Sequence, residues 1–499
     1  MVAALIARPV ATPGVDRQTA WIAAIVAALA LILTINPVGY LGGGLDDWRY
    51  LEASRCWVSH GPCLPDNHWA GRWPLVGAMA TSIALFGETR VAVGLPSLLY
   101  AAASLALLAA IGNRLFGAPV GYGAALLLLV VPAFAVELLD PNVGSAELFF
   151  LLLSAFLVAH FAEGKQRWLA FAAGFAWAMA CQVRETAVIG ALPLVIVLWR
   201  DRPALAAATA GAALPFLAET LFFWAQTGDP LFRRHLSVGH ALISSSELMG
   251  PVDRSRPPFF NPAYIAYWRH EPGLNIHWTI DGLVNLVVNL KAGILIGVTA
   301  LFSLLFARRL PVRERQVAGL LLALALLWAG TLIYALAIDP KPRMMLVPLT
   351  MCALVLALLL VRLHSEGSRA LSWVSAVVVA FPAAAVIATH EQVYASEPIV
   401  AAWAARHPGD VMVDPTARAH LALVPAARDF AGLGHDREYL LMRFDDGCKA
   451  VSPAPAGALY EPFDQVSLDP FGRAGRSAFC LLRRSREAER DSKADMKAS

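Results

Sequence analysis

The sequence predicts an α-helical membrane protein that crosses the bilayer many times. Of its 499 residues, 58% are hydrophobic and 15% are charged, whereas charged residues make up about a quarter of a typical soluble domain. Apolar runs long enough to cross a bilayer recur along the chain. Basic residues gather in alternate connections between these runs, which is typical of a multi-pass protein.

The apolar runs place the transmembrane helices. A crossing helix needs roughly 20 apolar residues, so we expect about eleven crossings. A shorter stretch at 73–86 is bounded by Pro74 and Gly87, and we expect an interfacial or re-entrant helix there. The predicted crossings lie near residues 20–40, 90–112, 118–137, 146–162, 167–183, 186–199, 204–226, 283–306, 316–338, 343–362 and 370–389.

The loop charges predict an orientation. Cytoplasmic loops carry an excess of Lys and Arg, and one set of connections does so here, for example Arg200 with Arg202. We therefore expect this set and the N-terminus in the cytoplasm, and the other loops at the periplasmic face of a bacterial inner membrane. The net charge of +3 is small and spread along the chain, so no nucleic-acid partner is expected. Membrane lipids are the expected surroundings.

Composition divides the chain into successive parts. The stretch VMVDP, within a region of ordinary soluble composition, predicts a buried strand ahead of a helix. The last residues are charged and poor in apolar side chains, which predicts disorder. The expected parts are a cytoplasmic N-terminus at 1–19, a transmembrane module at 20–390 with periplasmic loops at 41–89 and 227–282, a small periplasmic α/β domain at 391–483, and a disordered tail at 484–499.

Two cysteine pairs share predicted external segments. Cys56 and Cys63 lie in the first loop, and Cys448 and Cys480 lie in the tail, so each pair can be oxidised outside the cytoplasm. Spacing alone does not fix connectivity, so unrelated thiols remain the alternative for either pair.

Acids and bases gather in the predicted periplasmic loops, most densely in LDDWRYLEASRCW at 45–57. Charges at membrane depth are costly and tend to mark substrate or ion pathways. One such charge alone is more simply a solvated loop residue, but loops from distant parts of the chain deliver these residues to one face. We therefore expect a shared site. Its charged candidates are Asp46, Asp47, Arg49, Glu52, Arg55, His68, Arg72, Asp140, Arg184, Glu185, Asp339, Lys341 and Arg343.

These residue types suit group transfer from a lipid-linked phosphate. A carboxylate can act as general base on an acceptor hydroxyl, while arginines hold a phosphate that leaves with negative charge. The alternative is a transporter or flippase of a lipid-linked substrate, with the external charges as a binding gate. An ion or proton translocator would carry carboxylates within its helices. Polar residues there are few, namely His160 near the end of one span and Lys291 inside another.

The segment DDWRYLEASR resembles the first-loop signature of GT-C membrane glycosyltransferases. It is similar in particular to the bacterial aminoarabinose transferases of lipid A and to the protein O-mannosyltransferases, whose pattern runs roughly D-E-x-R-Y-A-E-I-x-R. The matching positions are Asp46, Asp47, Arg49, Tyr50, Glu52 and Arg55.

Later segments continue this resemblance, which covers about residues 20–365. Arg72 stands where the family usually has lysine, and Arg184 in QVRETAV stands at the position of another cation. Gly94 replaces an arginine, and Met344 replaces the tyrosine of a late Arg-Tyr-x-x-Pro motif. Asp140 and Arg343 fall on the second acidic loop and on that late motif, respectively.

The resemblance implies a GT-C fold and an inverting glycosyltransferase with a periplasmic active site. It implies a donor sugar linked to polyisoprenyl phosphate and a lipid, glycan or protein acceptor. Asp46 is the expected general base, with Asp47 as its neighbour or as the base itself, and Asp140 orienting the acceptor or pairing with an arginine. Arginine suits phosphate recognition, and the expected phosphate ligands are Arg49, Arg72, Arg184 and Arg343. The expected supporting residues are Tyr50, Glu52, Arg55, His68 and Glu185.

Two alternatives stay open around this site. Glu52 and Arg55 are three residues apart, a spacing at which they can simply brace a short helix. Adjacent aspartates can bind a divalent ion, but oxygen cages usually draw on several residues with spacings such as D-x-D. Since no Gly-rich loop or His/Cys cluster accompanies them, no cofactor is expected and a metal is not favoured. The identity of the sugar and of the acceptor stays open.

Overall fold

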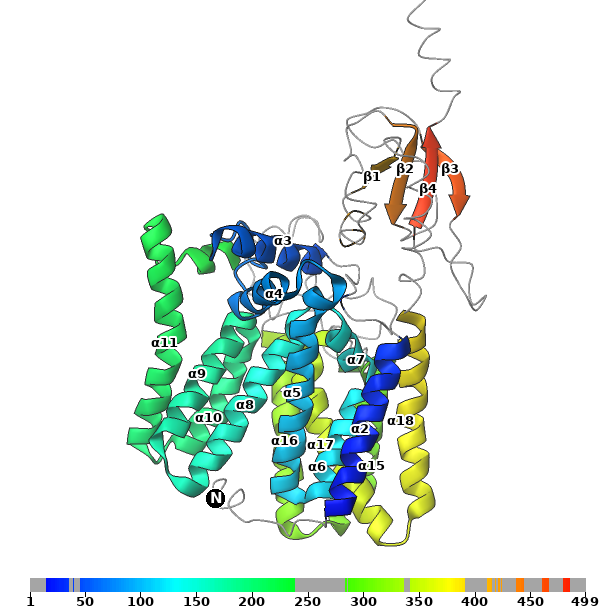
Figure 1. Ribbon diagram of the computed structural model, residues 1–499. Coiled ribbons are helices and arrows are strands. Elements are labelled where there is room, and N and C mark those ends of the chain that lie inside the picture. Colours follow the sequence, from blue (N-terminus) through cyan, green and yellow to red (C-terminus); the bar gives the residue numbers. More distant parts are fainter. Residues whose placement is uncertain are drawn as a thin grey trace, which may run out of the picture.

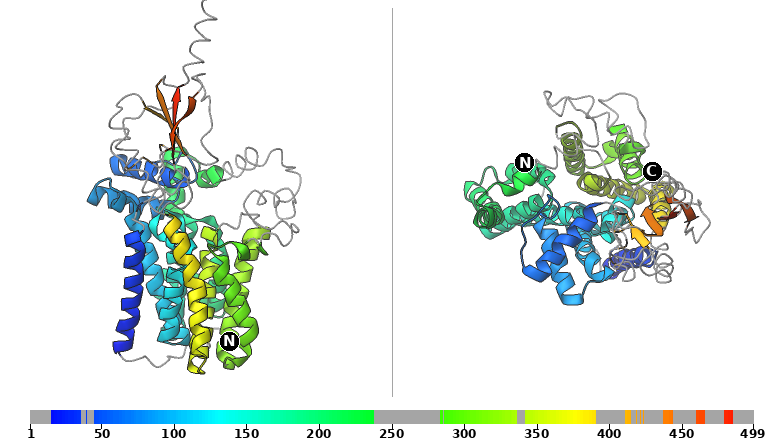
Figure 2. Two further views of the ribbon diagram at one scale, coloured as in Figure 1. Left: turned by 90° about the vertical axis from the view of Figure 1, so that its right-hand side faces the viewer. Right: turned by 90° about the horizontal axis from the view of Figure 1, so that it is seen from above.

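A bundle of helices makes up most of the protein (Figure 1). Helices α3 (Leu45–His60) and α4 (Trp73–Phe86) lie across one end of this bundle, and a small sheet lies beyond that end (Figures 1 and 2). The computed structural model describes residues 15–35, 39, 45–237, 283–284, 286–335, 342–390, 411–414, 418, 421, 423, 437–443, 460–465 and 479–484.

The predicted apolar runs form helices. Five helices of the described part are long and apolar enough to cross a membrane, or six if one bent pair counts as a single span. The chain is thus a helical membrane protein, while the count of about eleven crossings stays a prediction. The helices are α2 (Val15–Ile35), α5 (Arg90–Phe116), α6 (Ala118–Leu129), α7 (Pro132–Leu139), α8 (Val143–Gly164), α9 (Arg167–Val183), η1 (Glu185–Gly190), α10 (Ala191–Leu198), α11 (Arg202–Thr227), α15 (Gly293–Phe306), η4 (Ala307–Arg309), α16 (Val312–Gly330), η5 (Thr331–Ala335), η6 (Pro342–Met345), α17 (Leu346–Ser365) and α18 (Arg369–His390).

The connections between helices alternate between the two ends of the bundle. At the end away from α3, Arg114 at the end of α5 pairs with Glu163 at the end of α8. At the end that carries α3, Asp46 pairs with Arg343 over 297 positions of sequence. These two ion pairs therefore lie at opposite ends of the bundle, while the division of the loops by basic charge stays a prediction.

The short apolar stretch 73–86 is α4, as predicted. Its 14 residues are too few to cross a bilayer, and it lies across the bundle end (Figure 1). Pro74 occupies its first turn, and Gly87 follows its last residue with a positive φ of 75°. Leu85 and Phe86 are exposed at its end. This geometry suits an interfacial helix.

A sharp bend brings α7 into the interior. The axes of α6 and α7 differ by 72°, and Pro132 begins α7. Ala133 N donates to the carbonyl oxygen of Lys291 at 3.1 Å. The prediction that Lys291 lies inside a span is wrong, because it occupies an exposed turn before α15. The apolar run around it does not reveal where the helix begins.

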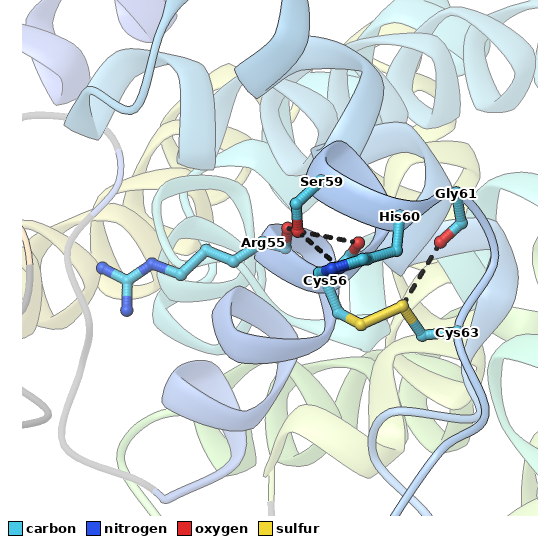
Figure 3. Close-up of a disulfide and its surroundings, with 6 residues drawn as sticks. All are labelled: Arg55, Cys56, Ser59, His60, Gly61 and Cys63. Atoms are coloured by element: carbon cyan, nitrogen blue, oxygen red, sulfur yellow. Dashed lines mark hydrogen bonds between the residues drawn. A yellow bond between two sulfur atoms is a disulfide. The ribbon is translucent and has the colours of Figure 1, made fainter.

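A disulfide joins Cys56, in the last turns of α3, to Cys63 (Figure 3). The first predicted cysteine pair is therefore confirmed. It ties the end of α3 to the chain that leads towards α4. Cys448 lies outside the described residues, so the pairing of Cys448 with Cys480 stays a prediction.

A four-stranded sheet represents the described part of the C-terminal region. Its order is β1-β2-β4-β3, with β1 parallel to β2 and the other neighbours antiparallel. The predicted strand VMV is β1 and is wholly buried. Within the helix expected after it, the structure describes Arg418 and Leu421 as helical and Leu423 as part of a turn. The expected start of the domain at 391 lies outside the described residues, and β4 extends to Arg484. The strands are β1 (Val411–Val413), β2 (Tyr439–Arg443), β3 (Tyr460–Gln465) and β4 (Phe479–Arg484).

Glycines allow α9 and α11 to pack backbone against backbone. A Cβ at Gly174 would overlap the carbonyl oxygen of Ala208, and a Cβ at Gly211 would overlap that of Phe171. Close approach through small residues stabilises helix pairs in lipid, where the hydrophobic effect does not drive helix association. Because α9 ends directly before Arg184, this packing also fixes the place of a candidate site residue.

We expect Gly211→Val to destabilise the protein. The added side chain must push α9 from α11, and overpacking of this kind costs about 1–3 kcal/mol. The midpoint of thermal unfolding in detergent should fall. Gly319→Ala is the control, since a Cβ there meets nothing within 4 Å, and its midpoint should stay unchanged or rise. Equal midpoints for Gly211→Val and the wild type would contradict the proposed role of this contact.

Candidate functional site

The acidic pair of the first-loop motif lies in the first turn of α3. The helix dipole favours negative charge at this position. Asp46 Oδ2 accepts a hydrogen bond from Arg343 Nη2 at 3.1 Å, and both side chains are partly exposed. Asp47 is buried. The structure thus unites the acidic pair with the arginine of the late motif.

Further carboxylates surround Asp47. Asp140 follows α7, and Glu137 lies within it; both are buried. Burial raises the pKa of Asp47 well above its usual value, and the charges of Asp140, Asp46 and Glu137 add to this effect. Arg343 acts in the opposite direction. Burial and the neighbouring carboxylates therefore favour the protonated form of Asp47 over its charged form.

Arg184 is committed to a buried ion pair. Its Nη1 donates to Glu147 Oε2 at 2.6 Å, and Thr186 Oγ1 donates to the other carboxylate oxygen at 3.0 Å. Both charged side chains are shielded from solvent, at 7% and 6% exposed. Removing one partner of such a pair leaves an uncompensated buried charge. Arg184 therefore has an evident structural role beside its predicted contact with phosphate.

The expectation that few polar residues lie inside the helices is wrong. Glu137, Glu147 and Glu219 lie in α7, α8 and α11, and all three are buried. Glu137 accepts from Gly144 N at 2.9 Å, and Glu219 accepts from Arg233 at 2.7 Å. A single acid within an apolar run, as in SAELFFLLL, is the signal that could have revealed them.

Arg233, which follows α11, binds the turn beside Arg184. Its guanidinium contacts Glu219 at 2.7 Å and Glu185 at 3.3 Å, and it donates to the carbonyl oxygen of Gln182 at 2.8 Å. Burial lowers the pKa of Arg233, but the two carboxylates outweigh this effect and raise it. No local sequence pattern points to Arg233, because its partners come from α9, η1 and α11.

Arg72 differs from the other candidate arginines. Its Nη1 donates to the hydroxyl oxygen of Tyr50 at 2.6 Å, and its guanidinium carbon lies 5.7 Å from the ring centroid. Its Nε is buried and has no hydrogen-bond partner within the described residues. The other three pair with carboxylates: Arg49 with Glu52, Arg184 with Glu147, and Arg343 with Asp46. Among the residues the structure describes, none forms an ion pair with Arg72.

The supporting residues of the motif do not pair as expected. Glu52 binds Arg49 at 3.0 Å, and Arg55 binds Glu88 at 2.6 Å, so Glu52 and Arg55 do not brace each other. The ring of His68 packs against Trp69 with centroids 3.8 Å apart. The candidates Asp339 and Lys341 lie outside the described residues.

The spacing of possible metal ligands in the structure bears on whether the acidic pair binds a metal. Within the described part, the His, Cys and acidic side chains grouped closely enough for a metal are Cys56, His60 and Cys63. Two of these are joined in the disulfide (Figure 3). Asp46 and Asp47 are not in a group of this kind. The absence of a cofactor requirement stays a prediction.

Residues 74–224 match the family described as dolichyl-phosphate-mannose-protein mannosyltransferase. This match confirms the resemblance over the segment that contains Asp140 and Arg184. It does not include the acidic pair, Arg72 or Arg343. No curated protein matches the chain.

Solved membrane enzymes are similar over most of the chain, at low identity. ArnT from Cupriavidus metallidurans bound to undecaprenyl phosphate is 14% identical with a TM-score of 0.44, covering 93% of this chain and 98% of that one. The oligosaccharyltransferase AglB from Archaeoglobus fulgidus, in complex with an inhibitory peptide and a dolichol-phosphate, is 12% identical with a TM-score of 0.48, covering 95% and 77%. TM-scores below 0.5 do not by themselves establish a shared fold.

We expect the stability of the protein to depend on pH through Asp47. Because its pKa is raised in the folded chain, the stabilisation present below the ordinary carboxyl pKa of about 4 is lost as pH rises through the raised value. Asp47→Asn removes this loss. The variant should unfold at a higher temperature than the wild type at pH 8, and the difference should shrink towards pH 4.

Thermal unfolding in detergent at several pH values measures this difference. The matched control is Asp66→Asn, which removes an exposed carboxylate. A stability difference for Asp47→Asn that is the same at every pH would show that burial of its charge is not the cause.

Proposed function

We propose that this chain is an inverting glycosyltransferase that acts at the periplasmic face of a bacterial inner membrane. It moves a sugar from a polyisoprenyl-phosphate donor to a hydroxyl or phosphate group of an envelope lipid, glycan or protein. One observation carries the proposal: Arg72, an arginine without an ion pair in the described residues, is bound through Tyr50 to the helix that bears Asp46 and Asp47. The mannosyltransferase family match over 74–224 supports it.

Arg72 is the first choice for binding the donor phosphate. A guanidinium presents donors in a planar fork that fits phosphate oxygens. Arg49, Arg184 and Arg343 must each give up or share a carboxylate partner before they bind an anion. Arg72 has only the neutral Tyr50 to share, and its Nε has a hydrogen to donate.

Asp46 is the proposed general base, and its ion pair with Arg343 sets a condition on the reaction. Arg343 donates to one oxygen of the Asp46 carboxylate, so that oxygen is occupied while the ion pair is formed. A donor phosphate beside Arg343 competes for the same guanidinium. Loss of the pair then frees Asp46 to accept a proton when the donor is in place.

The proposed displacement is a single step. The acceptor hydroxyl oxygen attacks the anomeric carbon on the face opposite the phosphate, so the configuration inverts. The bond between the anomeric carbon and the phosphate oxygen breaks, and the phosphate keeps the electron pair. Asp46 takes the acceptor proton, while Arg72 stabilises the charge that develops on the phosphate.

A lipid transporter or flippase is the second candidate. The buried Glu137, Glu147 and Glu219 give the helices the acids that a translocator needs. Glu147 and Glu219, however, are held by arginines, and Glu137 by a backbone amide. Such fixed pairs suit a structural role better than a relay, so we favour the enzyme.

We expect Asp46→Asn to abolish sugar transfer and to leave donor binding measurable, because the base is lost but Arg72 remains. Mass spectrometry of lipid A and envelope glycans from a deletion strain first identifies the missing product. The same strain carrying Asp46→Asn should also lack it, whereas Asp66→Asn should restore it. Purified Asp46→Asn protein should still bind undecaprenyl phosphate.

Two outcomes would count against the enzyme. One is a deletion strain with unchanged glycans, together with purified protein that transfers no sugar from any polyisoprenyl-phosphate donor. The other is movement of a lipid-linked substrate across vesicle membranes that is altered by Asp46→Asn while no product is lost. The second outcome would identify a flippase.

A further inference from the structure

Tyr50 lies between the two charged parts of the site. It is fully buried, and its hydroxyl oxygen accepts from Arg72 at 2.6 Å. The charges of Arg72 and Arg184 lower its pKa, and those of Asp46 and Asp47 raise it. Tyr50 is thus placed to link the basic and the acidic residues.

The contact between Tyr50 and Arg72 has a fixed chemical direction. A guanidinium has no acceptor, so the phenol oxygen must accept the hydrogen bond. Burial raises the pKa of Tyr50, which keeps the phenol neutral at physiological pH. The ring also lies within cation–π distance of the guanidinium, at 5.7 Å. Tyr50 therefore orients Arg72 by two contacts and brings no negative charge to it.

The other arginines of the site show what a charged partner does. Arg184 is fixed by Glu147, Arg233 by Glu219 and Glu185, and Arg343 by Asp46. Each carboxylate orients its arginine and also cancels its charge. A phosphate that approaches must compete with this carboxylate, whereas no described carboxylate forms an ion pair with Arg72. There the phosphate shares the guanidinium with the neutral Tyr50 hydroxyl.

We infer that Tyr50 is a positioning residue that holds the Arg72 guanidinium in place while leaving its positive charge available to the donor phosphate. The inference rests on the proposed function and deepens it. The ordered cation is available before the donor arrives, so the phosphate gains its contacts without the cost of ordering a long side chain.

Tyr50→Phe tests the inference, because it removes the hydroxyl oxygen and keeps the ring. We expect affinity for undecaprenyl phosphate to fall about tenfold, which is the effect of losing a contact worth roughly 1.4 kcal/mol. Tyr100→Phe is the matched control. The Tyr100 hydroxyl donates to the carbonyl oxygen of Pro74 at 3.0 Å, so its loss removes a contact to the start of α4 and leaves the hydrogen bond between Tyr50 and Arg72 in place. Affinity of this control should change less than twofold.

A double-mutant cycle separates positioning from simple loss of structure. In an Arg72→Gln background, Tyr50→Phe should weaken binding no further, since no guanidinium remains to be oriented. Thermal unfolding of each variant checks that all of them fold.

Each outcome of these binding measurements either supports or overturns the inference. Wild-type affinity in Tyr50→Phe overturns the inference, and so does an equal loss with and without Arg72. If Tyr50→Phe fails to fold, Arg72→Lys takes its place and keeps the charge without the planar fork, so unchanged affinity would overturn the inference. If the wild type itself does not bind undecaprenyl phosphate, the proposed function fails and the inference fails with it.

Discussion

A charge buried at the edge of a membrane needs a partner, and this constraint organises the polar end of the bundle. Glu147 from α8 binds Arg184 after α9, and Glu219 from α11 binds Arg233. Asp46 from α3 binds Arg343, which lies 297 positions away. The Asp46 pair joins α3 to η6, the Glu147 pair joins α8 to the end of α9, and the Glu219 pair joins α11 to the segment that follows it. The same pairs hold the candidate site in shape.

The same constraint distinguishes Arg72 from the paired arginines. Arg184, Arg233 and Arg343 bind carboxylates, but Arg72 binds the neutral hydroxyl of Tyr50. Asp46 and Asp47 lie on the same helix as Tyr50. The same end of the bundle therefore holds a guanidinium that can bind an anion and carboxylates that can accept a proton. These are the two functions that displacement of a sugar from a phosphate requires.

The sequence predicted the helices and the place of the site because both depend on local patterns. Apolar runs indicated the helices, including the short α4, and the DDWRYLEASR motif indicated the acidic first turn of α3. The ion-pair partners were not predictable in this way. Arg49 and Arg55 both lie three residues from Glu52, so spacing alone does not show which of them pairs with Glu52. In the structure Arg55 binds Glu88, 33 positions away, and Arg49 binds Glu52. Glu147 escaped notice because hydropathy averages over a window and hides a single acid.

The central claim is that Arg72 supplies the available charge for the donor phosphate, and the direct measurement is the affinity of arginine variants for undecaprenyl phosphate. Arg72→Gln should weaken binding about 10- to 100-fold, as expected for loss of a charged hydrogen bond. Arg49→Gln is the matched comparison, because Arg49 precedes Tyr50 in α3 and is already paired with Glu52. The affinity of this variant should change little. Equal affinities for the two variants, or a larger loss in Arg49→Gln, would contradict the claim.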